Sequence, residues 1–530
     1  MFSLLFRVNP GHFSGPFLSQ FSGRCWSTVA AILLLTLVAT PSAVMALDEP
    51  PQLLQQRAEY EALQKLLKRD YVTEYRRRMR ALKGYPLYPY LEFGSMKWSL
   101  QNVGSRAAKK VTSATLANFK KRYPDLPLHR ELKQSWLWSL AKQKNKSALI
   151  THYEDVNDRN LFCAWITARY GRGQRKAVAS ELKRYWNKDG VPAKGCNEEV
   201  AALIKSDLLP NPWLVDKLLH AMRDGRVSEV KYLQKRLPSG SSSRAATWLA
   251  THKDPRDRSE ERFNALKAGK TLEDDSLYTR LTILHGIRRA ARSNADKAKR
   301  YWDALQPKYR FRTEAVGKTD AVIAVYGAAQ QHPLAEKWID AVPAAHMTDK
   351  LRSWRLRLAL VRRDWKGLSS AIERMDKQRK AEPQWRYWQA RSLQEQGKTT
   401  AANKLFTKVA QNEGYYAFMA ADQVKAPYLI RYQSAPVNRE MQAELMTRKD
   451  LQRARELFRL GEMGRARREW RLMQKRIDKD SRRQSAILAH DWGWWRQAIG
   501  VLGNIAEPYD LVRRFPTPWQ SMVNIYSKNN

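Results

Sequence analysis

The sequence predicts an all-α fold in which antiparallel helix pairs stack into a superhelical solenoid. Two observations support this prediction. From Pro51 onward, nearly every long segment has apolar residues at three- and four-residue spacing, the period of a helix with one buried face. Runs that alternate apolar and polar residues and are rich in Val, Ile and Thr, as strands are, hardly occur. The alternative is an ordinary globular bundle of helices.

The first segment, residues 1–46, has the pattern of a secretory signal peptide. Arg7 and Arg24 are its only charged side chains, and an apolar run follows at 29–38. The run is shorter than the roughly 20 residues that span a bilayer. We expect cleavage after Ala46 and no stable membrane span in the mature chain. The alternative is an uncleaved N-terminal anchor.

The expected helices are 10–18 residues long and are separated by short breaks that contain proline. The first amphipathic stretch covers 53–67, and another covers 132–140. Breaks are predicted at Gly84-Tyr85-Pro86, at Tyr123-Pro124 and at Pro210-Asn211-Pro212.

Some of these helices form pairs that resemble one another. In the clearest pair, the first helix has its apolar face at Trp385, Trp388, Ala390 and Leu393. Gly397 ends this helix, and Ala402 and Phe406 open the next one. This spacing is close to the tetratricopeptide pattern, in which a small residue lies where two helices cross. Looser versions occur at 354–368 and 457–470. Because such a pair cannot bury its apolar face alone, it must stack on its neighbours.

The chain is strongly basic, with 95 Lys and Arg against 52 Asp and Glu and a formal charge of +43. Such a charge would suggest nucleic acid for a cytoplasmic protein. An exported chain instead meets cell-wall carboxylates and anionic lipids, and no nucleic-acid motif occurs here. Individual basic runs such as Arg288-Arg289 are typical of solvated helix faces.

The cysteine count fits export. Once Cys25 leaves with the signal segment, Cys163 and Cys196 remain, an even pair in an oxidising compartment. A disulfide between them would stabilise the folded state by very roughly 3–4 kcal/mol. The alternative is two buried free thiols.

The spacing of chemically reactive residues predicts no catalytic, metal or cofactor site. The Gly-Lys-Thr triplets at Gly269, Gly317 and Gly397 lack the preceding glycine of a phosphate-binding loop. The histidines form no His-x-x-x-His pair, and two cysteines cannot build a structural zinc site. Glutamates are numerous, but all are expected on helix surfaces rich in Arg and Lys, where an ion pair is the better explanation.

Five blocks of sequence resemble the soluble lytic murein transglycosylases of the Gram-negative periplasm. They are 82–92 (LKGYPLYPYLE), 119–127 (FKKRYPDLP), 385–391 (WRYWQAR), 414–421 (GYYAFMAA) and 509–516 (YDLVRRFP). The blocks keep the order that this family has, and the resemblance extends from about residue 50 to the end of the chain. Cys163 and Cys196 also fall where the family carries a disulfide.

The resemblance implies a ring of superhelical helices, then a helical linker domain, then a lysozyme-like catalytic domain. On this basis we expect a signal peptide at 1–46, the ring at 47–420, the linker at 421–508 and a stub at 509–530. The family cleaves the bond between N-acetylmuramic acid and N-acetylglucosamine without water, which leaves 1,6-anhydromuramyl ends. A Glu in a Glu-Ser motif acts as the acid.

The sequence departs from the family pattern at the catalytic motif. No Glu is followed by Ser, so the catalytic role is assigned to no residue, including Glu469 and Glu507. We expect a truncated, catalytically incomplete, periplasmic protein that needs no cofactor. Its expected partners are murein glycan strands and other cell-wall enzymes or a separate catalytic chain. The alternative is an exported helical-repeat adaptor that binds other proteins.

Overall fold

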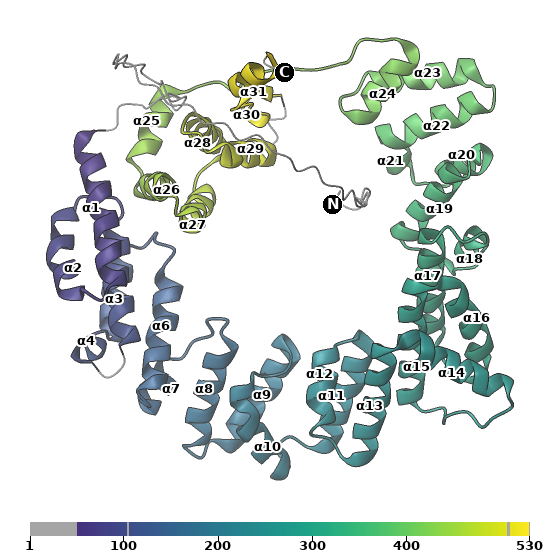
Figure 1. Cartoon of the computed structure of the whole chain (residues 1–530), viewed down its shortest axis with the longest axis horizontal. Coiled ribbons are helices and arrows are strands. Elements are labelled where there is room, and N and C mark those ends of the chain that lie inside the picture. Colours follow the sequence, from purple (N-terminus) through teal and green to yellow (C-terminus); the bar gives the residue numbers. More distant parts are fainter. Residues whose placement is uncertain (1–49, 103–104, 506–508, 529–530) are drawn as a thin grey trace, which may run out of the picture. The chain divides into compact units, whose positions relative to one another are not determined.

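The computed structural model describes residues 50–102, 105–505 and 509–528, and Figure 1 shows them as helices joined by loops, the one between α24 and α25 being long. Within these ranges no residue lies in a β-strand, which confirms the predicted all-α class. The predicted signal segment 1–46 and Cys25 lie outside the described residues. In the part of the chain that is described, no helix is long and apolar enough to cross a membrane.

The first helices follow the predicted pattern of apolar faces and proline breaks. Tyr60 and Leu63 of the predicted stretch 53–67 are buried on the inner face of α1. Pro86 lies in the turn before α3, and Pro124 lies between α5 and α6. The bounds are α1 Pro51–Lys68, α2 Val72–Arg78, η1 Met79–Leu82, α3 Tyr88–Gln101, α4 Arg106–Lys109, α5 Ser113–Arg122, α6 His129–Lys142 and α7 Lys146–His152.

The middle of the chain continues as helices that pack on their neighbours in sequence. Pro210 is the N-cap of α11 and Pro212 lies in its first turn, where a missing N–H costs nothing, so this predicted break starts a helix. The bounds are α8 Arg159–Tyr170, α9 Arg175–Asp189, η2 Lys194–Cys196, α10 Asn197–Lys205, α11 Asn211–Asp224, α12 Val227–Gln234, α13 Ser239–Lys253, α14 Pro255–Lys267, α15 Leu277–Ser293, α16 Ala295–Leu305, η3 Gln306–Lys308, α17 Thr313–Ala329, α18 Ala335–Asp340 and η4 Ala344–His346.

The predicted helix pairs are present. Gly397 adopts a φ of 77° and ends the helix before the turn, while Ala402 and Phe406 are fully buried in the crossing. The paired helices here are α19 Asp349–Val361 with α20 Trp365–Glu373, and α22 Pro383–Glu395 with α23 Thr399–Ala410, followed by α24 Tyr415–Val424; the short α21 Lys377–Lys380 lies between the pairs. The predicted boundary between ring and linker, at 420/421, falls inside α24.

The last helices contain the third predicted pair, α26 and α27, joined through Gly461. Helices of a single turn also occur, such as α4, α21 and α30, and are shorter than the 10–18 residues expected. Each begins at a Ser or Asp whose side chain accepts a backbone N–H, so one turn is capped locally. The bounds are α25 Arg439–Thr447, α26 Lys449–Arg459, α27 Met463–Gln474, α28 Lys479–Asp491, α29 Trp495–Asn504, α30 Leu511–Arg514 and α31 Gln520–Lys528.

The first and last helices share one hydrophobic core, although they are hundreds of residues apart in sequence. Tyr60, Leu91 and Trp136 of the first helices belong to the same buried cluster as Leu457 and Trp470. The disulfide lies elsewhere: Cys163 of α8 is bonded to Cys196 of η2, with their Cα atoms 5.0 Å apart, which confirms the predicted pair. Both cysteines are buried in a separate core.

Candidate functional site

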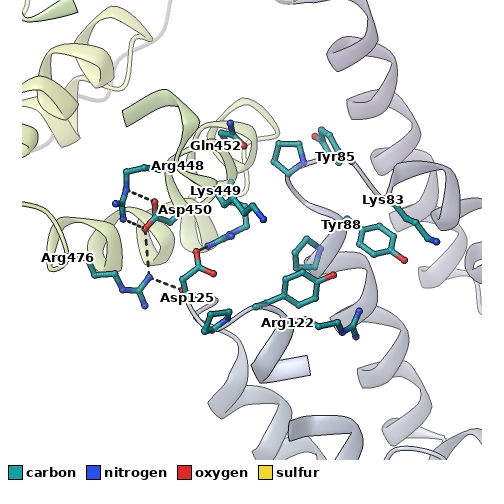
Figure 2. Close-up of a pocket in the computed structure, with 16 residues that line it drawn as sticks. Lys83, Tyr85, Tyr88, Arg122, Asp125, Arg448, Lys449, Asp450, Gln452 and Arg476 are labelled. Atoms are coloured by element: carbon teal, nitrogen blue, oxygen red, sulfur yellow. Dashed lines mark hydrogen bonds and ion pairs between the residues drawn. The ribbon is translucent and has the colours of Figure 1, made fainter. Parts of the chain in front are cut away.

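A cavity of about 810 Å³ lies where two turns of the N-terminal part face α26 (Figure 2). Its lining residues come from within 83–89, 122–125 and 448–453, together with Arg476. Two of these segments lie in the sequence blocks 82–92 and 119–127 that carried the family resemblance. The turns project into this space because Pro86 and Pro124 interrupt the helices there.

Three tyrosines, Tyr85, Tyr88 and Tyr123, form one wall of the cavity. Tyr85 is fixed in place by a hydrogen bond to a buried carboxylate. The Tyr85 hydroxyl donates to Glu456 Oε2 at 2.7 Å, and the Arg57 guanidinium donates to both oxygens of Glu456 at 2.8 and 3.0 Å. Tyr85 is only 1% exposed, and its burial, then its hydrogen bond to Glu456, raises its pKa far above the ordinary range. Tyr85 therefore stays neutral and acts as a fixed hydrogen-bond donor.

The floor is a buried ion-pair network centred on Arg453. Its Nε and Nη2 atoms donate to the two oxygens of Glu469 at 2.8 and 3.0 Å, and Nη2 also donates to Asp125 Oδ2 at 2.6 Å. The Tyr90 hydroxyl donates to Glu469 Oε1 at 2.8 Å. Arg453 is 2% exposed and Glu469 is fully buried. This network joins α26 and α27 to the N-terminal part of the chain.

Each of the two aspartates that line the cavity forms ion pairs with arginines. Asp450 contacts Arg448 at 2.8 Å and Arg476 at 3.8 Å. Burial by itself would raise the pKa of Asp125, but the hydrogen bond and the charge of Arg453 outweigh burial and hold that pKa below its usual value. Asp125 thus stays ionised, which suits a structural anchor and not a proton donor to a glycosidic oxygen.

Two lysines of the cavity, Lys83 and Lys449, are exposed, and among the described residues neither has an acidic partner within ion-pair distance. Arg122, by contrast, is paired with Glu92 at 2.7 Å. Figure 2 shows Lys83 and Tyr88 on the N-terminal side of the space and Lys449 on the α26 side. The arrangement offers mobile cations and aromatic faces to an anionic or polymeric ligand.

The glutamates singled out in the sequence lie in different places. Glu469 is in the buried network described above, and Glu507 lies outside the described residues. The expectation that all glutamates lie on helix surfaces is wrong for Glu469, Glu456 and Glu229, each of which is at most 3% exposed. Their burial is compensated because each forms an ion pair with an arginine and accepts a hydrogen bond from an aromatic side chain, as Glu229 does with Arg226 and Trp186.

Sequence reasoning missed the lysines of the cavity because basic residues occur throughout the chain. The one available signal was that Lys83 stands inside the 82–92 block. The predicted glycine triplets have local explanations: Gly269 follows the end of α14 with a φ of 64°, and Gly317 lies inside α17. Within the described ranges, no group of three or more potential metal ligands was found.

Comparison with known proteins gives matches along most of the chain. Residues 444–506 match the model of the soluble lytic murein transglycosylase L domain. The soluble lytic murein transglycosylase of Escherichia coli K12 is 23% identical over 507 residues, which are 95% of this chain and 74% of that protein. Its counterpart in Salmonella typhimurium is 24% identical and aligns over 95% of this chain and 75% of its own length.

Solved structures share the fold. An inactive variant of the lytic transglycosylase Slt from Pseudomonas aeruginosa has a TM-score of 0.71 at 24% identity, over 89% of this chain and 74% of that one. The 70-kDa soluble lytic transglycosylase of Escherichia coli has a TM-score of 0.72 at 22% identity, over 90% and 75%. The aligned 95% of the chain includes the N-terminal turns and α26, which line the cavity. Along 95% of its length the chain is similar to soluble lytic murein transglycosylases, and residues 444–506 match their L domain.

Proposed function

We propose that this chain binds peptidoglycan glycan strands in the periplasm, as the polymer-binding part of a lytic murein transglycosylase. The proposal takes its substrate from the relatives, which are named for their action on murein. The reaction of the family is the non-hydrolytic cleavage of the bond between N-acetylmuramic acid and N-acetylglucosamine. The described residues contribute binding to that reaction, and the acid that protonates the glycosidic oxygen is assigned to none of them.

The observation that carries the proposal is the cavity between the N-terminal turns and α26, with its aromatic wall and two lysines that lack acidic partners. Peptide stems of murein end in carboxylates, which Lys83 and Lys449 would attract. The rings of Tyr88 and of the neighbouring prolines offer apolar surface to the faces of sugar rings. Because the floor is fixed by buried ion pairs, the cavity does not need to form on binding.

Such contacts are individually weak. An exposed ion pair contributes at most about 1 kcal/mol and is screened by salt. Many weak contacts along a basic surface would hold a polymer and still let it slide. The large excess of Lys and Arg in this chain fits such a mode of binding.

The test measures binding of the purified chain to isolated murein sacculi. We expect binding to fall steeply between about 0.05 M and about 0.5 M salt. The double variant Lys83→Ala/Lys449→Ala should bind about fivefold more weakly, because two exposed contacts are lost. The matched control is Lys109→Ala/Lys110→Ala on and beside α4, at exposed positions outside the cavity. Binding that ignores both salt and the cavity lysines would contradict the proposal.

Two further parts of the proposal concern the export of the chain and a protein partner. Export predicts that the chain isolated from the periplasm begins at Leu47. A second lytic enzyme or a separate catalytic chain is supported by exposed apolar residues at the start of α31. Trp519, directly before the helix, is 63% exposed, and Met522 and Val523 within it are 43% and 57% exposed. These residues are spaced to share one helix face. A purified lysozyme-like domain from a relative should bind the chain, and Trp519→Ser should weaken that binding; no binding to either form would remove the partner.

A further inference from the structure

The second half of α15 carries a row of basic side chains on one face. His285, Arg288, Arg289 and Arg292 are spaced i, i+3, i+4 and i+7, so they lie along the same side of the helix. This helix packs against α11, α13, α14, α16 and α17. The sequence suggested a solvated face for Arg288-Arg289, but Arg288 and Arg289 are both half-buried.

A stacked aromatic group borders this face. His252 of α13 and His285 are hydrogen-bonded to each other through Nδ1 and Nε2 at 3.0 Å, and their ring centroids are 5.2 Å apart. The indole of Trp248 lies 4.1 Å from the His285 ring, centroid to centroid. Trp248 is fully buried. The two imidazoles are therefore held in fixed positions by packing and by each other.

The hydrogen-bonding groups without a partner in this region are donors. Nε of Arg289 and Nε1 of Trp248 are both buried and have no hydrogen-bond partner. Arg288 donates Nε to Thr319 Oγ1 at 2.9 Å and Nη2 to the Ala315 carbonyl at 3.0 Å, but to no carboxylate. Buried donors are normally satisfied, so what is missing here is an acceptor.

The electrostatics point the same way. Burial is the largest cause that lowers the pKa of both histidines. The pKa of His252 is lowered, and that of His285 falls to about 3. The charged groups that lower both pKa values further include Arg289 and Arg292, and Lys231 of α12 contributes at His252. Among the described residues, no carboxylate lies within ion-pair distance of Arg288, Arg289 or Arg292. Positive charge without a paired carboxylate is costly for the two arginines that are half-buried.

We propose that this face of α15 is a binding site for an oxyanion, either a carboxylate or a phosphate group, held by Arg289 and Arg292 beside the His252/His285 pair. Guanidinium groups present planar pairs of donors that match both kinds of oxyanion. The site lies outside the cavity described above, and it does not depend on peptidoglycan binding.

The test is a thermal unfolding titration of the full chain with inorganic phosphate, at ionic strength held constant with chloride. A ligand that binds only the folded state raises its stability, so about 10 mM phosphate should raise the melting temperature above the value in chloride. Isothermal titration gives the affinity. Arg292→Gln should weaken phosphate binding at least fivefold, and because this side chain is exposed, the variant is expected to fold normally. Arg106→Gln, at an exposed position on α4, is the matched control and should bind like the parent.

A second arm distinguishes the two sources of the oxyanion. N-acetyl-D-alanine offers a carboxylate, and its amide has the same shape without the charge. Tighter binding of the acid than of phosphate indicates a peptide carboxylate, and the reverse order indicates a phosphate group. Stabilisation by phosphate that does not exceed the chloride effect, together with equal binding of acid and amide, would overturn the proposal, as would an equal loss in Arg292→Gln and Arg106→Gln.

Discussion

Replacing Arg453 with methionine tests whether the buried network joins the two ends of the chain. The substitution removes all three hydrogen bonds from Arg453 to Glu469 and Asp125. Glu469 then remains fully buried, with the Tyr90 hydroxyl as its one remaining donor among the bonds described here. Because a buried charge without its partner is poorly solvated, such losses cost about 3–5 kcal/mol. We expect Arg453→Met to destabilise the contact between the N-terminal part and α26–α27 by that amount.

The assay is amide hydrogen exchange of α3, α26 and α27, with urea denaturation beside it. A loss of about 3–5 kcal/mol corresponds to opening that is roughly 150-fold to 5000-fold more frequent. The control is Arg77→Met, which removes an ion pair with Glu74 whose Arg side chain is 72% exposed. That variant should exchange like the parent, since water solvates both groups.

The double variant Arg453→Met/Glu469→Leu separates the lost pair from the stranded charge. When both partners become apolar, the penalty of a buried uncompensated charge disappears, so the double variant should be more stable than Arg453→Met alone. If the double variant is as unstable as the sum of the two single variants, the energetic reasoning is wrong. If Arg453→Met leaves exchange in α3 unchanged, the network does not hold the two ends together.

Three further predictions follow from the same contacts. Tyr85→Phe should lower the free energy of unfolding by about 1.5–3 kcal/mol in urea, because Glu456 loses a buried donor; an unchanged midpoint would speak against this bond. Cys163 and Cys196 should resist alkylation in the native chain, and their reduction should cost about 4 kcal/mol; labelling without reductant would remove the disulfide. The pKa values of Asp125 and Glu131 are lowered on folding: burial opposes this, but Arg453 and Lys97 outweigh it. These two carboxylates therefore contribute fully to the stability of the folded chain above about pH 5, and the contribution is lost as the pH falls through their folded pKa values. Urea unfolding midpoints measured at neutral and at acidic pH will show this loss.

The helices could be predicted from the sequence because their spacing is a local signal. Ala402 and Phe406 sit four residues apart, and Gly397 precedes them, so a helix pair with a small residue at its crossing can be identified without knowledge of the rest of the chain. The turn before α3 could be predicted for the same reason, since proline removes a donor wherever it stands.

The cavity could not be predicted in this way because it depends on contacts between distant segments. Arg453 and Asp125 are 328 residues apart, and nothing in the residues around Arg453 distinguishes it from the other basic residues on its helix. The resemblance to a family singled out 82–92, but it did not show that Lys83 and Lys449 share one space. Only the structure pairs some arginines with acids and leaves these lysines without them.

Arginine and lysine have different roles in this chain. Buried arginines stabilise the fold, whereas the exposed lysines of the cavity are the cations that we propose to bind the ligand. The buried pairs described here use arginine, because its fork of donors satisfies a carboxylate in two places; Arg57, Arg226 and Arg453 are examples. The lysines of the cavity, Lys83 and Lys449, are exposed and remain accessible to an anion. Screening by salt acts strongly on exposed charges and weakly on buried ones. The chain should therefore leave murein at a salt concentration at which its thermal unfolding is unchanged, and unfolding that shifts together with release would show that the same charges serve both purposes.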